Sequence, residues 1–241
     1  MVDEVLALKP DLLFGIEATA RVMRNKTTTI PIVLTFSSDP VGTGLAQSLA
    51  RPGGNVTGVA TLAEGLAAKS IELLTQVLPK MTTLGVLLDP NVPSSVRVEQ
   101  PVRDAARTKG VRTITYWARD RAGLEQVFLA LARDRPGALL QPAGSGILFG
   151  ERQFISENVL RLRLPYAGAG DGALLVYAAD LHALHRQAAS HAARILRGAN
   201  PAELPIEQPT RFTLTVNSKV VRALGLKMPQ SVLVQATEVI E

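Results

Sequence analysis

Short, fully apolar runs alternate along the chain with longer segments in which apolar residues recur every three or four positions. Runs of the first kind predict buried strands, and segments of the second kind predict helices that cover a sheet. The expected strands are residues 11–16, 30–36, 55–60, 84–88, 111–117, 138–140, 164–167, 173–178 and 212–216, with a tail at 232–240. The expected helices are residues 2–8, 17–26, 66–78, 94–109, 124–132, 151–162, 180–197 and 218–224. This alternation predicts βαβ units and an α/β fold with mainly parallel sheets, in two lobes rather than one very wide sheet.

The stretch from Ser37 to Gly58, SSDPVGTGLAQSLARPGGNVTG, has the strongest local signals. A buried strand leads into Asp39-Pro40, which predicts the start of a helix with Asp39 as its N-cap, because proline is tolerated in a first helical turn. Residues 51–55, RPGGN, predict the end of that helix, since glycine adopts left-handed geometry and proline prevents continuation. Such a helix start would aim backbone N–H groups beyond the end of the strand, where open α/β sheets bind ligands.

Composition narrows the class of protein. The chain has 241 residues, 46% of them hydrophobic, which predicts one large or two small folded domains and excludes a disordered chain. The net charge is +5, but the basic residues are scattered among acids without a run of five, so nucleic-acid binding is not expected. The absence of cysteine excludes disulfides and thiolate chemistry. No apolar run reaches the roughly 18 residues of a membrane span.

The N-terminus, MVDEVLALKPDLL, carries acids at Asp3 and Glu4 where a signal peptide would carry positive charge. The segment therefore does not predict a signal peptide. Its pattern is that of an amphipathic helix already under way, which predicts that further sequence lies upstream.

Two glycine-rich segments fail the motifs of nucleotide binding. Residues 42–44 lack the Gly-Lys-Ser/Thr ending of a phosphate-binding loop, and residues 168–172 precede a strand where a dinucleotide fingerprint needs a helix. We expect residues 168–172 to form a flexible connector. His182 and His185 lie three apart on one predicted helix, with His191 further on, but without a zinc motif a solvated helix face is favoured over a metal site.

The sequence carries no catalytic constellation. No nucleophile-elbow motif is present, and no serine is paired by motif with a histidine. Asp39, Asp89 and Asp171 flank predicted strands, where general acids would lie, but capping and turn roles account for each of them. The residues therefore predict a binding protein rather than an enzyme, with no catalytic residue, metal or cofactor.

Three segments together resemble a known family: residues 30–58, residues 84–95 (LGVLLDPNVPSS) and residues 195–226. They are similar to the substrate-binding proteins of ABC transporters, in the family that includes binding proteins for tryptophan and other aromatic amino acids. The likeness covers essentially the whole chain, and DPVGTGL followed by ARPGGNVTG is its most specific part.

The resemblance implies a type I periplasmic binding fold, in which two Rossmann-like lobes clamp a ligand between them. The first lobe would hold residues 1–82 and 177–209, and the second would hold residues 83–176 and 210–241. Chain crossings are expected near residues 81–83, 175–177 and 209–212.

The function implied by the resemblance is the solute-binding component of an ABC importer for a small polar solute such as an amino acid. A transporter permease would be the partner, and the location would be periplasmic, although the chain as given has no signal peptide and would remain cytoplasmic. Two alternatives stay open. One is the effector-sensing domain of a transcription regulator with the same fold, and the other is a truncated homologue that binds nothing.

The resemblance also suggests which residues contact the ligand. A turn after the first strand, the Asp-Pro turn and a turn in the second lobe offer hydroxyls, amides and N–H groups for a carboxylate and acids for an ammonium group. The sequence departs from the family pattern at Gln141-Pro142-Ala143, usually Leu-Pro-Asp, and at Val176-Tyr177-Ala178, usually Ser-Tyr-Gly. The expected ligand-binding residues are Glu17, Thr19, Ser38, Asp39, Pro40, Asn91, Ser94, Pro142 and Tyr177.

The largest departure from the family lies at the front of the chain. Family members begin with a signal or lipoprotein peptide and then a strand, a helix and a second strand, none of which matches this sequence. We therefore expect an incomplete first lobe in which residues 11–16 form an unpaired sheet edge, prone to association as a dimer. The chain would then be a truncated form of a longer protein, or its lobe would be completed by a partner chain.

Overall fold

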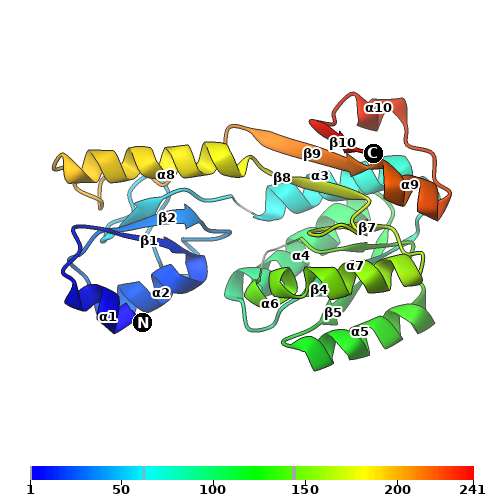
Figure 1. Ribbon diagram of the computed structural model, residues 1–241, viewed down its shortest axis with the longest axis horizontal. Helices are drawn as coiled ribbons and strands as arrows, with labels where there is room; N and C mark the ends of the chain where they lie inside the picture. Colours follow the sequence, from blue (N-terminus) through cyan, green and yellow to red (C-terminus); the bar gives the residue numbers. More distant parts are fainter. Residues whose placement is uncertain (1, 62, 143–144) are drawn as a thin grey trace. The chain divides into compact units, whose positions relative to one another are not determined.

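Two mainly parallel sheets organise the chain, one in each of two units (Figure 1). The computed structural model describes residues 2–61, 63–142 and 145–241. The first unit comprises residues 1–62 and 179–212, and the second comprises residues 63–178 and 213–241. Helices alternate with strands in both units, so the predicted α/β fold with mainly parallel sheets is confirmed.

The first unit places a three-stranded parallel sheet between helices. The strands lie in the order β1-β2-β3. Their side chains point alternately to the two faces of the sheet, where they form one apolar cluster with α2 and another with α8. The strands are β1 (Leu13–Ile16), β2 (Ile32–Phe36) and β3 (Val56–Gly58). The helices are α1 (Val2–Ala7), α2 (Glu17–Lys26) and α8 (Leu181–Leu196).

The predicted sheet edge is present in this unit. β1 is the outer strand, and its Phe14 and Ile16 side chains are 48% and 51% exposed. An exposed apolar edge strand favours association. Dimer formation through this edge stays a prediction.

The second unit has a seven-stranded sheet in the order β10-β9-β8-β7-β6-β4-β5. Helices α3, α4, α9 and α10 cover one face, and α5, α6 and α7 cover the other. The strands are β4 (Thr83–Leu88), β5 (Arg112–Trp117), β6 (Ala138–Leu140), β7 (Tyr166–Ala167), β8 (Leu175–Ala179), β9 (Phe212–Asn217) and β10 (Glu238–Ile240). The helices are α3 (Ala63–Val77), α4 (Pro93–Thr108), α5 (Arg121–Asp134), α6 (Gly146–Gly150), α7 (Arg152–Arg161), α9 (Ser218–Leu224) and α10 (Gln230–Leu233).

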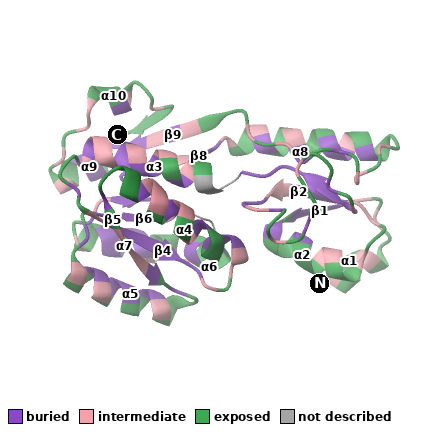
Figure 2. Ribbon diagram, turned by 180° about the vertical axis from the view of Figure 1, so that it is seen from behind, coloured by how far each residue is buried: buried purple, intermediate pink, exposed green. Residues whose placement is uncertain are grey.

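Strand β4 shows why this sheet has to be covered on both faces. Leu84, Val86 and Leu88 belong to the apolar cluster under α3 and α4, whereas Leu87 belongs to the cluster under α5 and α7. A run that is apolar at every position is typical of a parallel strand with helices on both sides. Figure 2 shows β4 and β6 coloured as buried.

Helix α3 lies in a different unit from the one expected. The predicted first lobe extended to residue 82, but the first unit ends at residue 62 and α3 groups with the second unit. Its residues Ile71 and Leu74 are buried in the same cluster as Leu84 of β4. The apolar stripe of α3 thus covers the seven-stranded sheet, which the local pattern could not reveal. The later boundaries fall after residues 178 and 212.

The predicted helix after Asp39 is wrong. The segment makes a single turn, in which the Thr43 N–H donates to the Asp39 carbonyl at 3.0 Å and the Leu45 N–H donates to the Pro40 carbonyl at 2.9 Å. Gly44 then adopts a left-handed φ of 75°, which ends the turn. The local start signal was correct, but the stop comes within one turn instead of at residues 51–55.

The N-cap of α8 agrees with the predicted helix start at Asp180. The Asp180 Oδ1 atom accepts a hydrogen bond from the Ala183 N–H at 3.0 Å. This bond is the main cause that holds the pKa of the Asp180 carboxyl below its ordinary value of 3.8. Because the folded pKa is the lower one, the contribution of the charged cap is complete above pH 3.8 and is lost as the pH falls through the folded pKa.

We therefore expect the first turn of α8 to fray on acidification below pH 3.8. The measurement is the pH dependence of the Ala183 amide resonance by NMR. Asp180→Asn is the control, because an asparagine also caps a helix but does not titrate. An Ala183 resonance that titrates identically in both proteins would show that another group is responsible.

Candidate functional site

In the first unit, polar groups gather where β1 and β2 end. Glu17 begins α2 directly after β1 and is only 9% exposed. Its Oε2 atom accepts three hydrogen bonds from the turn after β2: from the Ser37 hydroxyl at 2.8 Å, the Ser38 N–H at 2.9 Å and the Asp39 N–H at 3.1 Å. One carboxylate oxygen therefore holds the whole turn in place.

This arrangement changes the role expected for the turn. The sequence predicted that N–H groups near Asp39 would be available to an anionic ligand. Two of them, those of Ser38 and Asp39, donate instead to Glu17. The anion that these groups stabilise is thus supplied by the protein itself, and Glu17 organises the turn.

Two further expected residues, Asp39 and Pro40, belong to the same turn. The Asp39 side chain is partly exposed, and its Oδ1 accepts from the Gly42 N–H at 2.7 Å. Pro40 is buried next to it. Thr19 is exposed on α2, and its hydroxyl donates to the Ile16 carbonyl at 3.0 Å rather than to the turn. Glu17, Ser38 and Asp39 are therefore brought into direct contact, whereas Thr19 makes a separate local bond.

In the second unit, the turn after β4 has a comparable design. Asp89 is 2% exposed, and its N–H donates to the Ser95 hydroxyl at 3.0 Å. Its Oδ1 accepts from the Asn91 N–H at 2.9 Å. The Asn91 residue is exposed, and Ser94 is buried in the first turn of α4. Asp89 thus shapes the turn that carries both expected contacts.

The end of β6 carries Gln141 and Pro142. Pro142 is buried, and Gln141 is partly exposed. The Gln141 N–H donates to the Ala167 carbonyl at 2.9 Å, and its side-chain Oε1 accepts a hydrogen bond from the Tyr166 hydroxyl. Ala143, the third residue of this turn in the sequence comparison, lies outside the described residues.

Tyr177 lies on β8 and is partly buried against the large apolar cluster beneath α3 and α4. Ser37, Ser95, Gln141 and Tyr166 also lie at these edges but were not among the binding residues expected from the sequence. The available signal was position: Ser37 and Gln141 directly follow strands, and the carboxyl ends of parallel strands share one edge of a sheet.

The glycine-rich segment 168–172 differs from the flexible connector expected. Gly172 is buried, and a Cβ atom there would lie 2.6 Å from the Ser156 Cα. A Cβ atom on Gly168 would lie 2.2 Å from the Tyr166 hydroxyl oxygen. The glycines therefore permit close packing of the loop on α7 and on Tyr166.

The histidines do not converge. His182 and His185 are exposed on α8, whereas His191 is buried with Nδ1 3.0 Å from the Gln187 carbonyl and Nε2 2.9 Å from the Pro205 carbonyl. Across residues 2–61, 63–142 and 145–241, no group of three or more histidines and acids is placed to hold a metal ion. Within the same ranges, every helix is too short or too polar to cross a membrane.

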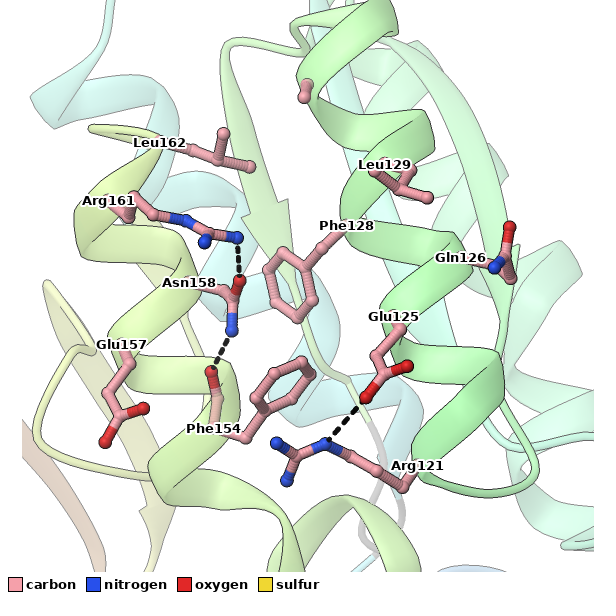
Figure 3. A pocket seen from close by; sticks show the side chains of 11 residues that line it. Arg121, Glu125, Gln126, Phe128, Leu129, Phe154, Glu157, Asn158, Arg161 and Leu162 are labelled. Carbon is pink, nitrogen blue, oxygen red and sulfur yellow. Dashed lines mark hydrogen bonds and ion pairs between the residues drawn. The ribbon is translucent and has the colours of Figure 1, made fainter.

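A groove of about 780 Å³ runs between α5 and α7 and contains none of the expected site residues. Figure 3 shows Phe128 and Phe154 inside it, with ring centroids 5.6 Å apart in an edge-to-face arrangement. The Arg121 guanidinium lies 3.5 Å from the centroid of the Phe154 ring and pairs with Glu125 and Glu151. The Arg121 guanidinium is thus already paired with carboxylates of the protein.

Comparison with known proteins identifies the family. A family model described as ABC transporter substrate binding protein matches residues 1–240. The chain belongs to this family. Its members are substrate-binding proteins and not enzymes, so the family match confirms the expectation of a binding protein. Members typically work outside the cytoplasmic membrane with a small-molecule ligand and a transporter permease.

Individual members of the family are distant relatives. A tyrosine-binding protein from Clostridioides difficile is 24% identical over 226 residues, which cover 91% of this chain. The chain spans 64% of the length of that relative.

Two solved structures are similar over nearly the whole chain. The ABC domain from Streptococcus pneumoniae in complex with L-Trp has a TM-score of 0.91 and 23% identity, and covers 100% of this chain and 84% of its own. A conserved domain protein from Vibrio cholerae has a TM-score of 0.90 and 26% identity, with coverage of 99% and 81%. The type I periplasmic binding fold implied by the resemblance is therefore confirmed.

Proposed function

We propose that this chain is the solute-binding component of an ABC importer and that it clamps a small polar solute between its two units. The observation that carries the proposal is the pair of ordered polar turns at the carboxyl ends of parallel strands. One is the turn from Ser37 to Asp39, held by Glu17, and the other is the turn from Asp89 to Ser95. Ligands of open α/β sheets bind at such strand ends.

We further propose that the solute is an amino acid with an aromatic side chain. Two similar proteins support this class, since one is named a tyrosine-binding protein and the other was solved with L-Trp. In the proposed complex, hydroxyl and amide groups of the two turns hold the carboxylate, and Asp39 holds the ammonium group. Ser38, Pro40, Asn91, Ser94, Pro142 and Tyr177 are the other proposed contacts, with Thr19 at the rim.

Closure of the two units around the solute would create the surface that a permease recognises. Glu17 is assigned to the support of the Ser37–Asp39 turn and not to direct contact. The proposed location is the periplasm.

We expect L-tyrosine or L-tryptophan to raise the thermal unfolding temperature of the protein. At a free ligand concentration of about 100 times Kd, binding stabilises the folded state by about 2.7 kcal/mol, which corresponds to a rise of roughly 5–10 °C for a chain of this size. Differential scanning fluorimetry measures the shift, with L-lysine and D-glucose as controls of other chemistry. Two outcomes would refute the aromatic amino-acid assignment. One is the same temperature shift with all four compounds, and the other is no shift with either aromatic amino acid.

A further inference from the structure

The Tyr166 hydroxyl lies at the centre of an unexpected polar contact in the second unit. Tyr166 is fully buried, and β7 pairs it with Leu139 of β6. The hydroxyl donates a hydrogen bond to Oε1 of Gln141. The tyrosine thus links β7 to the side chain that directly follows β6.

The Tyr166 hydroxyl determines how the Gln141 carboxamide is turned. It donates its proton to the carboxamide oxygen, which can only accept. Burial raises the pKa of the Tyr166 hydroxyl above its ordinary value of 10.0, so this proton is retained. Because Oε1 faces Tyr166, the Nε2 group of Gln141 is directed away from it.

The loop after β7 is shaped to admit this contact. A Cβ atom at position 168 would lie 2.2 Å from the Tyr166 hydroxyl oxygen and 2.4 Å from its Cζ atom. Glycine is therefore the residue that lets the chain pass over the phenol. The structural role of the glycine-rich segment 168–172 is therefore close packing on Tyr166. It is neither a nucleotide fingerprint nor a flexible connector.

We propose that Gln141 is a specificity-determining residue whose Nε2 donates a hydrogen bond to an acceptor oxygen of the solute, and that Tyr166 is the positioning residue that fixes it. This inference rests on the proposed function. Gln141 is partly exposed and directly follows β6. Asp89 directly follows β4, the neighbouring strand, so the two residues lie at the same edge of the sheet. An NH₂ group in this place selects a carboxylate or hydroxyl oxygen and rejects an ammonium group, which is itself a donor.

The first experiment measures affinity for L-tyrosine and L-tryptophan by isothermal titration calorimetry. We expect Tyr166→Phe to weaken binding about tenfold. Gln141→Glu should weaken it about a hundredfold, because a glutamate carboxylate can only accept hydrogen bonds and would face an acceptor oxygen of the solute. Tyr116→Phe is the matched control. It also removes a buried hydroxyl of the second unit, one that donates to Asp134 at 3.1 Å, and it should leave affinity unchanged.

A double-mutant cycle separates positioning from a general loss of structure. In a Gln141→Leu background, Tyr166→Phe should cause no further loss of affinity, because its effect is exerted through the amide. Equal losses in both backgrounds would overturn the positioning role. Wild-type affinity in Gln141→Leu would overturn the specificity role while leaving the proposed function intact.

A second measurement does not depend on the solute. NMR relaxation of the Gln141 side-chain NH₂ in the ligand-free protein should show a rigid amide in the wild type and in Tyr116→Phe, and a mobile one in Tyr166→Phe. If the wild type binds neither amino acid, the aromatic assignment fails, and this measurement still decides the positioning role of Tyr166. An amide that is equally mobile in all three proteins overturns it.

Discussion

Gly58→Ala should unfold the first unit. Gly58 has a φ of 128°, a conformation that residues with a Cβ atom rarely adopt, and β3 pairs it with Leu34 of β2. A Cβ atom would lie 2.3 Å from the Leu34 carbonyl oxygen and 2.5 Å from its nitrogen. Backbone atoms of a buried central strand cannot move aside, so we expect a loss of about 4 kcal/mol in the free energy of unfolding of this unit.

The measurement must resolve the two units. The single tryptophan, Trp117, and the three tyrosines all lie in the second unit, so intrinsic fluorescence reports on that unit alone. Hydrogen exchange of the β2 amides is therefore the readout for the first unit. Gly65→Ala, where a Cβ atom would meet nothing within 4 Å, is the control and should be neutral or slightly stabilising. Wild-type protection of β2 in Gly58→Ala would contradict the expected strain.

Glu17→Ala is expected to have the second largest effect. It removes the acceptor of three hydrogen bonds. The buried Ser37 hydroxyl and Ser38 N–H then lose their acceptor. Because each hydrogen bond to a charged group contributes about 1.5–3 kcal/mol and the contributions overlap, we expect a loss of about 3 kcal/mol in the stability of the first unit. Solute affinity should fall with it, since the Ser37–Asp39 turn loses its support.

Two variants make this result specific. Glu17→Gln keeps an acceptor oxygen of the same shape and should cost about 1 kcal/mol. Glu203→Ala removes an exposed carboxylate from the same unit and should change little. Hydrogen exchange of the Ser38 and Asp39 amides reports the turn directly. If these amides are as protected in Glu17→Ala as in the wild type, the carboxylate does not hold the turn.

The sequence predicted the features that depend on neighbouring residues. The start of α8 at Asp180 could be predicted because the capping residue and its partner, Ala183, are three residues apart. The all-apolar run of β4 indicated a strand buried on both faces, because that property belongs to the strand itself. The alternation of such segments was sufficient for the α/β fold.

Features that depend on distant partners could not be predicted in this way. Glu17 and the Ser37–Asp39 turn are about 20 residues apart, and Tyr166 and Gln141 are 25 apart, so their hydrogen bonds become visible only when the strands are in register. The prediction of a helix after Asp39 was wrong because Gly44 adopts a left-handed conformation, which the local start signal at Asp39-Pro40 does not indicate. The position of α3 depended on which sheet its apolar stripe covers.

The division of the chain has a consequence for its synthesis. The sheet of the first unit is covered on one face by α8, which ends at Leu196, and the sheet of the second unit includes β10, which ends at Ile240. The first unit therefore stays incomplete until residue 212 has been synthesised, and the second until β10 has been synthesised. Since domains fold as whole units, a nascent chain that stalls before α8 exposes apolar surface on both sheets. Interrupted translation should therefore yield proteolysis substrates and not a folded half of the protein.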